Sequence, residues 1–306
     1  MKNLLHMPRA FLLAAFALLG AGTLQAANFF DNSIAGYSLG NASGGANIGG
    51  NGHKNWAIFA MSGGVTITDT GLDGSYDVLG NVGIVGSGAL TMSASKIQGS
   101  VYRDSGNYTP SGSPVITGTN TTGNGGYLTT GFNNANAASA GWGALTTNQL
   151  GAPGDLTFGG AFAGVAPGTI ALNNTAASIT DNTAGSTYVL NLTDLILAGT
   201  SAVLTLNGTS STNYVINVNQ YMTLSSKAQI ALGNGGIGAN NVLFNVQNTT
   251  PAYDVTLSGA AVVNGIILAP TRNVKLTGGS VVYGEVIGKG VSLSGRSKVI
   301  NPFVSP

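Results

Sequence analysis

Val255-Thr256-Leu257-Ser258-Gly259 is the stretch that decides the fold, because it alternates apolar and hydroxyl side chains and ends on glycine. The pattern returns as Val274-Lys275-Leu276-Thr277-Gly278, which starts 19 residues later, and as Val291-Ser292-Leu293-Ser294-Gly295, which starts a further 17 residues on. Strict alternation sends one set of side chains inward and the other outward, as in a β-strand. A nearly constant period in the high teens is typical of a coil that stacks on copies of itself. The repeats therefore predict an all-β fold, a parallel β-solenoid.

The composition agrees with a β-rich body and excludes one class of partner. Of the 306 residues, 43% are apolar and only 7% are charged, and the chain has 48 glycines and no cysteine. Disorder would require low hydrophobicity with high net charge, whereas the net charge here is +1. A nearly neutral chain offers no field to attract nucleic acid, so nucleic-acid binding is excluded. Without disulfides, the fold must depend on backbone ladders and stacked apolar side chains.

The first 26 residues have the pattern of a secretion signal. Lys2 and Arg9 precede an apolar run, and Leu24-Gln25-Ala26 is a suitable cleavage site before Ala27. The apolar run is shorter than the roughly 18 to 20 residues of a membrane anchor. We therefore expect a secreted or cell-surface protein, with the periplasm as an alternative location, and no transmembrane helix in the mature chain.

The mature chain is predicted to divide into a leader and one solenoid domain. Residues 27–55 are rich in Gly, Asn and Ser and are expected to form an irregular leader that caps the first coil. Residues 56–306 are expected to form the solenoid domain, with a loop and a helix inserted at about 104–150. The open ends of such a stack need caps, and the leader and the tail at residues 301–303 are the candidates.

The insertion contains the one helix that the sequence predicts. Tyr108–Gly126 is composed mainly of Thr, Gly, Asn and Pro and is expected to be a loop. In the following stretch, Ala138, Trp142 and Leu145 have the spacing of one helical face. A helix between residues 133 and 150 is therefore expected to bury Trp142 along the side of the stack.

Several phrases of the chain resemble a known family of exported bacterial proteins. They are Asn81-Val82-Gly83-Ile84-Val85-Gly86, Val189-Leu190-Asn191-Leu192, Asn217-Val218, Val242-Leu243-Phe244-Asn245-Val246, Gly265-Ile266-Ile267-Leu268-Ala269-Pro270 and Gly284-Glu285-Val286-Ile287-Gly288. With the alanine-rich helix, these phrases resemble the choice-of-anchor A, or PEP-CTERM-associated, β-solenoid proteins over roughly residues 56–300. The resemblance implies a β-solenoid with one flanking α-helix, similar to the bacterial ice-binding proteins.

The end of the chain departs from that family. Its sorted members typically continue into a Pro-Glu-Pro motif, an apolar span and a basic end, whereas this sequence stops at Val304-Ser305-Pro306. The departure favours release from the cell or retention in the periplasm over anchoring, with a truncated reading frame as the alternative.

Few side chains of the chain are suited to catalysis. Glu285 is the only glutamate and His53 the only histidine of the mature chain. Few residues could therefore form a catalytic pair of carboxylates, and a Ser-His-Asp triad would depend on His53 alone. Metal sites built from His and Cys lack ligands as well. A polysaccharide-acting solenoid would need a groove with two or more carboxylates, for which Asp194, Asp254 and Glu285 are the candidates. Tyr221, Tyr253 and Tyr283 are the aromatic residues that could line such a groove. We therefore expect no enzyme activity, no catalytic residue and no cofactor.

Two other motifs are weaker. Asp69, Asp73 and Asp77 are candidate calcium ligands because calcium prefers several oxygen ligands, but their spacing fits neither an EF-hand nor the calcium-binding nonapeptide repeat. Solvated turn aspartates are the default interpretation. The stretch at 233–238 matches G-x-G-x-x-G, yet no helical pattern follows it, so a turn is expected rather than a nucleotide site.

The outward hydroxyl side chains of the repeated pattern are the main functional candidates. Residues two apart on a strand lie about 6.7 Å apart and neighbouring coils about 4.8 Å, so stacked pairs would make a lattice able to order water. Two observations argue against a ligand-binding array. Lys275 and Asn207 interrupt it, and threonine is common on the solvent-exposed side of strands whether or not a ligand binds there. The candidate ligand-face or ice-face residues are Thr66, Thr68, Thr91, Ser93, Thr205, Thr223, Ser225, Thr256, Ser258, Thr277, Ser292 and Ser294.

These observations favour a non-catalytic structural or adhesive protein of the cell surface or extracellular matrix. The first alternative is an ice-binding protein that uses the outward Thr/Ser array. The second is a solenoid that binds or acts on polysaccharide. Matrix polysaccharide, ice and other surface proteins are the partners that these hypotheses imply.

Overall fold

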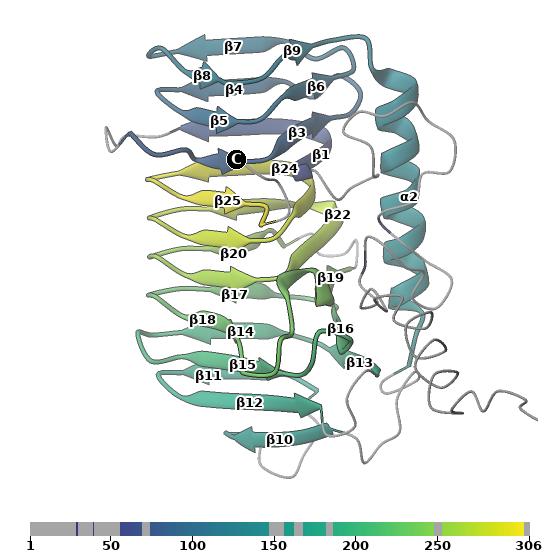
Figure 1. Cartoon of the computed structure of the whole chain (residues 1–306), viewed down its shortest axis with the longest axis vertical. Coiled ribbons are helices and arrows are strands. Elements are labelled where there is room, and N and C mark those ends of the chain that lie inside the picture. Colours follow the sequence, from purple (N-terminus) through teal and green to yellow (C-terminus); the bar gives the residue numbers. More distant parts are fainter. Residues whose placement is uncertain are drawn as a thin grey trace, which may run out of the picture.

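The computed structural model describes residues 56–68, 74–146, 156–161, 168–181, 186–247 and 253–302, together with Phe29 and Leu39. These residues form a parallel β-solenoid flanked by one α-helix, which is the predicted fold class (Figure 1). Among them, no helix is both long enough and apolar enough to span a membrane.

The strands of the solenoid belong to two sheets, one of 15 strands and one of 10. The larger sheet contains β1 (Trp56–Thr68), β3 (Asn81–Ile84), β4 (Leu90–Ser93), β6 (Val101–Arg103), β7 (Tyr108–Ser111), β9 (Asn120–Thr121), β11 (Ile170–Asn173), β13 (Thr187–Leu192), β14 (Leu195–Ala198), β16 (Asn213–Val218), β17 (Met222–Leu224), β19 (Val242–Val246), β20 (Val255–Leu257), β22 (Ile266–Leu276) and β24 (Val286–Ser294). The smaller sheet contains β2 (Val78–Leu79), β5 (Lys96–Gln98), β8 (Val115–Ile116), β10 (Leu156–Gly160), β12 (Ala176–Asp181), β15 (Val203–Asn207), β18 (Gln229–Leu232), β21 (Val262–Asn264), β23 (Val281–Tyr283) and β25 (Lys298–Ile300). The pairing between these strands is parallel, except that β10 runs antiparallel to β12.

The larger sheet bends, so the solenoid has three faces. β1, β22 and β24 are long strands, and where they pair their register shifts between Ala60 and Gly64 in β1 and between Ala269 and Asn273 in β22. The first halves of these strands continue the face formed by β13, β16 and β19. Their second halves continue a separate face formed by β11, β14, β17, β20, β4 and β7. The smaller sheet makes the third face.

The chain does not climb the stack in sequence order. β1 pairs with β24 on one side and with β3 and β4 on the other, so the first strand lies in the middle of the stack. The chain rises from β1 to β7 and β9, and then returns through the helix to the opposite end at β10. It climbs again until the C-terminal strands meet the first strand, seen in Figure 1 as yellow next to dark blue.

The tail therefore does not cap an end of the stack, contrary to the prediction. The backbone N–H of Asn301 donates to the carbonyl of Leu79, and its side-chain amide donates to the carbonyl of Trp56 at 2.7 Å. Both contacts lie at the central junction because the last coil closes on the first. The expected leader cap lies largely outside the described residues.

The end of the stack near β7 holds an additional coil that the sequence did not reveal. The stretch expected to be a loop, 108–126, instead contains β7, β8 and β9, with β7 paired to β4. Pro110 lies in β7 and lacks a backbone N–H, which suits an edge strand. Its presence in a Gly- and Thr-rich stretch masked the strand pattern.

Helix α2 (Gly125–Gly143) starts and ends earlier than predicted, but it buries the predicted face. Trp142 is fully buried and its ring meets the ring of Phe29 edge-on at 5.2 Å between centroids. Ala138 is buried too, whereas Leu145 follows the helix and is only partly buried. A second hydrophobic cluster, separate from the solenoid interior, joins the helix to the sheet; it contains Phe29, Leu39, Trp56, Phe59, Met61, Val85, Leu128, Ala135, Ala138, Trp142, Val189, Val215, Leu243, Ile266, Leu268 and Ile287.

A ladder of three asparagines holds the C-terminal end of α2 against the sheet. The Asn245 amide donates to Asn217 Oδ1 at 2.8 Å, and the Asn217 amide donates to Asn191 Oδ1 at 2.7 Å. The same amides donate to carbonyls at the end of the helix, from Asn245 to Ser139 and from Asn217 to Trp142, each at 2.9 Å. Both carbonyls lie in the last turn of the helix, so the ladder ties this end of α2 to the sheet; the Trp142 carbonyl also accepts from the Leu145 backbone N–H. The strand phrases that end in Asn-Val or Asn-Leu are thus explained by helix docking.

The glycines that close the repeated pattern suit a left-handed backbone position, which Ala94 and Ser226 occupy in other coils. Gly259, Gly278 and Gly295 have φ of 62°, 63° and 61°, which is the left-handed region. They also stack closely: a Cβ on Gly278 would lie 3.1 Å from the backbone nitrogen of Gly259. The 233–238 stretch forms a turn as predicted, with only the three-residue 3-10 helix η2 (Ala239–Asn241) following it.

Candidate ligand-binding face

One face of the larger sheet is not covered by α2, and we call it the open face. Its central column of outward side chains runs along the stack in register, through strands β7, β4, β1, β24, β22, β20, β17, β14 and β11. In that order, the central column is Thr109, Thr91, Thr66, Ser292, Lys275, Thr256, Thr223, Ile196 and Ala171.

Two further columns flank the central one. The outer column lies two residues later on each strand or just beyond its end, and consists of Ser111, Ser93, Thr68, Ser294, Thr277, Ser258, Ser225, Ala198 and Asn173. The inner column lies two residues earlier, and consists of Asn107, Ala89, Gly64, Gly290, Asn273, Asp254, Tyr221 and Asp194. Side chains between the columns point into the core: Val65, Ile67, Leu90, Met92, Val255, Leu257, Val291 and Leu293 are at most 3% exposed.

Eleven of the twelve candidate residues lie on the open face, and Thr205 does not. Thr205 is on β15 in the smaller sheet, between Ser178 and Ala231. Asn207 follows it there and donates to Thr180 Oγ1, so it does not interrupt the array as expected. Alternation distinguishes inward from outward side chains, but it does not say which face of a three-sided coil a strand occupies.

Thr109 and Ser111 belong to the open face but were missed. They are in register with Thr91 and Ser93 of β4 and are exposed. The alternation of two hydroxyl residues around Pro110 was a signal for them, although proline is unusual within a strand.

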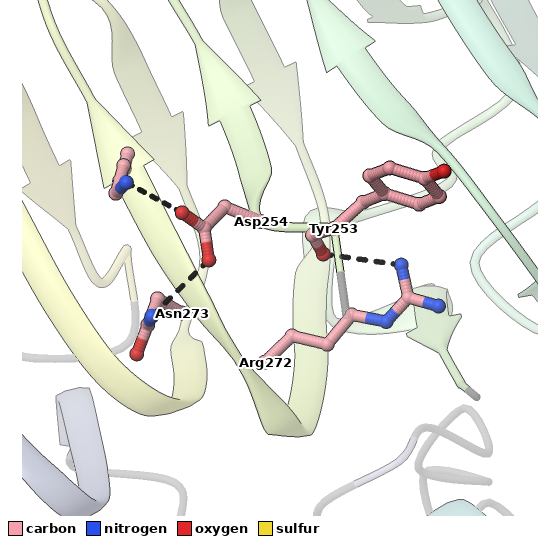
Figure 2. Close-up of polar contacts among 5 residues, drawn as sticks. Tyr253, Asp254, Arg272 and Asn273 are labelled. Atoms are coloured by element: carbon pink, nitrogen blue, oxygen red, sulfur yellow. Dashed lines mark hydrogen bonds and ion pairs between the residues drawn. The ribbon is translucent and has the colours of Figure 1, made fainter. Parts of the chain in front are cut away.

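The predicted interruption at Lys275 is present and is an ion pair. The Lys275 ammonium lies 2.5 Å from Asp254 Oδ2, and the side chains are 51% and 28% exposed. The Asn273 amide donates to Asp254 Oδ1 at 3.1 Å, so the carboxylate is held from both sides (Figure 2). Lys275 stands between Ser292 and Thr256 in the central column.

A cluster of tyrosine and arginine side chains lies where the inner column turns toward the helix side. Tyr221 and Tyr253 stack with ring centroids 4.0 Å apart, and the hydrogen bond between them raises the pKa of Tyr221. Arg272 is 2% exposed and donates to the Tyr253 carbonyl (Figure 2). It also donates to the carbonyls of Gln220 and Asn219, so it joins three coils at this corner. Its burial lowers the pKa of the Arg272 guanidinium. No motif of the sequence indicates this role for Arg272.

The three tyrosines proposed to line one groove do not share a face. Tyr283 is 40% exposed on β23 of the smaller sheet, between Asn264 and Ile300. Tyr221 and Tyr253 are at the edge of the open face instead. The aromatic groove of a polysaccharide-acting solenoid is therefore not assembled from these residues.

The acidic candidates are engaged in structural contacts. Asp77 is 3% exposed and its Oδ2 accepts from the Lys96 backbone N–H at 2.7 Å, so it is not the solvated turn residue that was expected. Asp194 Oδ1 accepts from the Tyr221 backbone N–H at 3.1 Å, and Glu285 is fully buried beside the start of β24. Asp69, Asp73 and His53 lie outside the described residues. Within the described part, no three His, Cys, Asp or Glu side chains come together as a metal site.

Comparisons with known proteins agree with this architecture. A family model described as "Putative Ice-binding-like adhesive domain" matches residues 27–299. A structure of the ice-binding protein LeIBP from an Arctic yeast, reported for its antifreeze activity, is 19% identical with a TM-score of 0.52, over 83% of this chain and 93% of that chain. A structure of the glycosylated form of LeIBP is 20% identical with a TM-score of 0.53, over 83% and 94%. At these identities the likeness concerns the fold, and no curated protein matches the sequence.

Proposed function

The chain belongs to the ice-binding-like adhesive domain family, and on that basis we propose that it binds ice through the open face. Ice binding, the first alternative from the sequence, thereby replaces the structural or adhesive role as the leading hypothesis. The observation that carries it is the register of hydroxyl side chains: in four adjacent coils, β7, β4, β1 and β24, both the central and the outer column consist only of Thr and Ser.

The physical basis of the proposal is the regular spacing of these groups. Adjacent parallel strands lie about 4.8 Å apart and outward residues on one strand about 6.7 Å apart, so the hydroxyls repeat in two directions. The core beneath is closely packed and holds the strands in place. Hydroxyl oxygens that repeat on a stiff support can hold water in a repeating arrangement, and binding to an ordered water surface needs such preorganisation.

The smaller sheet offers the contrasting surface. Its outward positions in the central coils carry side chains of different length and polarity, namely Gln229, Val262, Val281, Lys298, Asn264, Tyr283 and Ile300. No repeating hydroxyl pattern is present among them. The proposed ice contact is therefore assigned to the open face alone.

Ice binding is tested by thermal hysteresis and inhibition of ice recrystallisation with the purified mature chain. We expect the native protein to show both, and Thr66→Tyr on β1 to abolish them because the ring prevents close approach of the face. Thr205→Tyr on β15 is the matched control, since it places the same ring on the other sheet. The proposal is wrong if the native protein shows neither effect, or if Thr205→Tyr is as damaging as Thr66→Tyr.

We further propose that the protein acts outside the cytoplasm, as a non-catalytic adhesive domain. The family description and the secretion-signal pattern of residues 1–26 support this address, and the choice-of-anchor A resemblance of the sequence points the same way. Fractionation of a producing culture, with mass spectrometry of the mature N-terminus, tests it. Recovery in the medium or at the surface, with an N-terminus near Ala27, is expected; recovery solely in the cytosol with Met1 retained would contradict it.

A further inference from the structure

We propose that the ion pair of Lys275 with Asp254 divides the open face, and that only the part formed by β7, β4, β1 and β24 adsorbs to ice. The inference rests on the proposed function and names the portion of the face that carries it. We call this portion the upper panel, and the portion formed by β20 and β17 the lower panel; β22, with Lys275, lies between them.

The upper panel consists only of short side chains. Its central and outer columns hold eight Thr and Ser residues in register, without a charged residue. Its inner column is Gly290, Gly64, Ala89 and Asn107, so no side chain of that column is larger than asparagine, and Lys275 borders the panel only at its last strand, beside Ser292. A surface of this kind can approach an extended ligand along its whole area.

The lower panel has the same hydroxyls but different neighbours. Thr256 is directly beside Lys275, whose side chain is half exposed and carries a strongly hydrated ammonium on a flexible stem. The inner column at this level holds Asp254 and Tyr221, which are longer than the glycines above them. Water around these charges is oriented by them rather than by the hydroxyl rows. The lower hydroxyls are thus separated from the upper ones and less able to act with them.

Stability does not account for the ion pair. Exposed pairs contribute about 0–1 kcal/mol, and many contribute nothing that can be measured. The Asp254 carboxylate needs only an acceptor to keep its contact with Asn273, which Asp254→Asn retains through its carbonyl oxygen. Variants at these two positions are therefore expected to fold, so that their effect on ice binding can be read directly.

The first test compares one ring placed on each panel. Thr91→Tyr on β4 and Thr256→Tyr on β20 replace partly buried threonines of the same column, and tyrosine is a good strand residue. We expect Thr91→Tyr to lose most of the thermal hysteresis and Thr256→Tyr to keep the native value, with unchanged circular dichroism for both. Equal losses in the two variants would overturn the inference.

The second test removes the boundary. The double variant Asp254→Asn with Lys275→Thr would extend the central hydroxyl column without a break from β7 to β17. We expect higher thermal hysteresis than the native protein at equal molar concentration, whereas Lys275→Arg, which keeps the charge, gives no increase. A double variant that folds like the native protein and shows no increase would overturn the inference.

The outcomes separate the inference from the proposed function. A native protein without any effect on ice overturns the proposed function and with it the inference. An active native protein that depends equally on both panels leaves ice binding in place and overturns only the division at Lys275. An active protein that tolerates Thr256→Tyr but not Thr91→Tyr supports both.

Discussion

The helix-covered face and the open face share three long strands, β1, β22 and β24, yet they have opposite surfaces. In β1, Trp56, Phe59 and Met61 join the hydrophobic cluster beneath α2, whereas Thr66 and Thr68 of the same strand stand on the open face. β22 and β24 change in the same way along their length. Since the backbone pairing continues through both faces, the outward side chains alone decide whether a face is covered or left open to a ligand.

The comparison predicts that outward residues stabilise the protein on one face and leave stability unchanged on the other. Under the helix, outward side chains are buried and hydrogen-bonded, so their removal costs free energy of unfolding. On the open face the outward side chains contact solvent, so their removal is expected to weaken ligand binding and to leave the free energy of unfolding nearly unchanged. Four variants test this contrast, beginning with the largest expected effect.

Trp142→Ala is expected to lower the free energy of unfolding by about 3–5 kcal/mol, because it empties the fully buried site of an indole between the helix and the sheet. Urea unfolding followed by circular dichroism measures it. Trp142→Phe is the control and should cost less, since a ring remains to meet Phe29. A loss below about 1 kcal/mol for alanine would mean that the helix contributes little to the covered face.

Asn217→Ala is expected to cost about 1–3 kcal/mol, because it removes the three hydrogen bonds that buried Asn217 makes with the Trp142 carbonyl, Asn191 and Asn245. Amide hydrogen exchange should also quicken in the last turn of α2. Asn234→Ala, at an exposed turn position, is the matched control and should be neutral. Equal effects of the two substitutions would show that the ladder does not dock the helix.

The double variant Asp254→Asn with Lys275→Thr is expected to change stability by only about 0–1 kcal/mol, as for other partly exposed ion pairs. The native pair should also weaken as salt is added, since its charges are accessible to solvent. The readout is the urea midpoint at low and high salt. A loss comparable with that of Asn217→Ala would mean that the open face is stabilised by its outward residues after all.

Thr66→Val is expected to have the smallest effect, within about 0.5 kcal/mol, because the side chain is exposed on the open face and valine also favours strands. Thermal unfolding with the native protein alongside measures it. A destabilisation above about 1 kcal/mol would contradict the contrast between the two faces.

The inward and outward directions of the side chains could be predicted from the sequence, because they follow from local alternation. The assignment of a strand to a face could not. Thr205 and Thr256 stand in similar local patterns, but they lie on different sheets because the corners of each coil decide the face. Corners depend on left-handed residues and on side chains such as Arg272, whose partners are 19 to 53 positions away in the sequence.

The order in which the coils stack also could not be predicted from local sequence patterns. Nothing in the sequence near Asn301 indicates that it pairs with Leu79 and Trp56 rather than capping an end. The additional coil at β7 was hidden for a different reason, because proline and glycine usually indicate loops. The helix was recognised from Ala138 and Trp142, but its start was misplaced because its first turns are rich in glycine and polar residues.

The central position of β1 has a consequence for how such a chain can form and vary. The last coil can be added only when the first is in place, and contacts such as Thr68 with Leu293 join residues 225 positions apart. Folding dominated by pairs so distant in sequence is expected to be slow. Loss of the last coil would open an inner gap with two bare strand edges, whereas strands at the outer ends, such as β7 and β10, have a neighbour on one side only. Lengthening or shortening of this stack is therefore easiest in the middle of the gene, not at its ends.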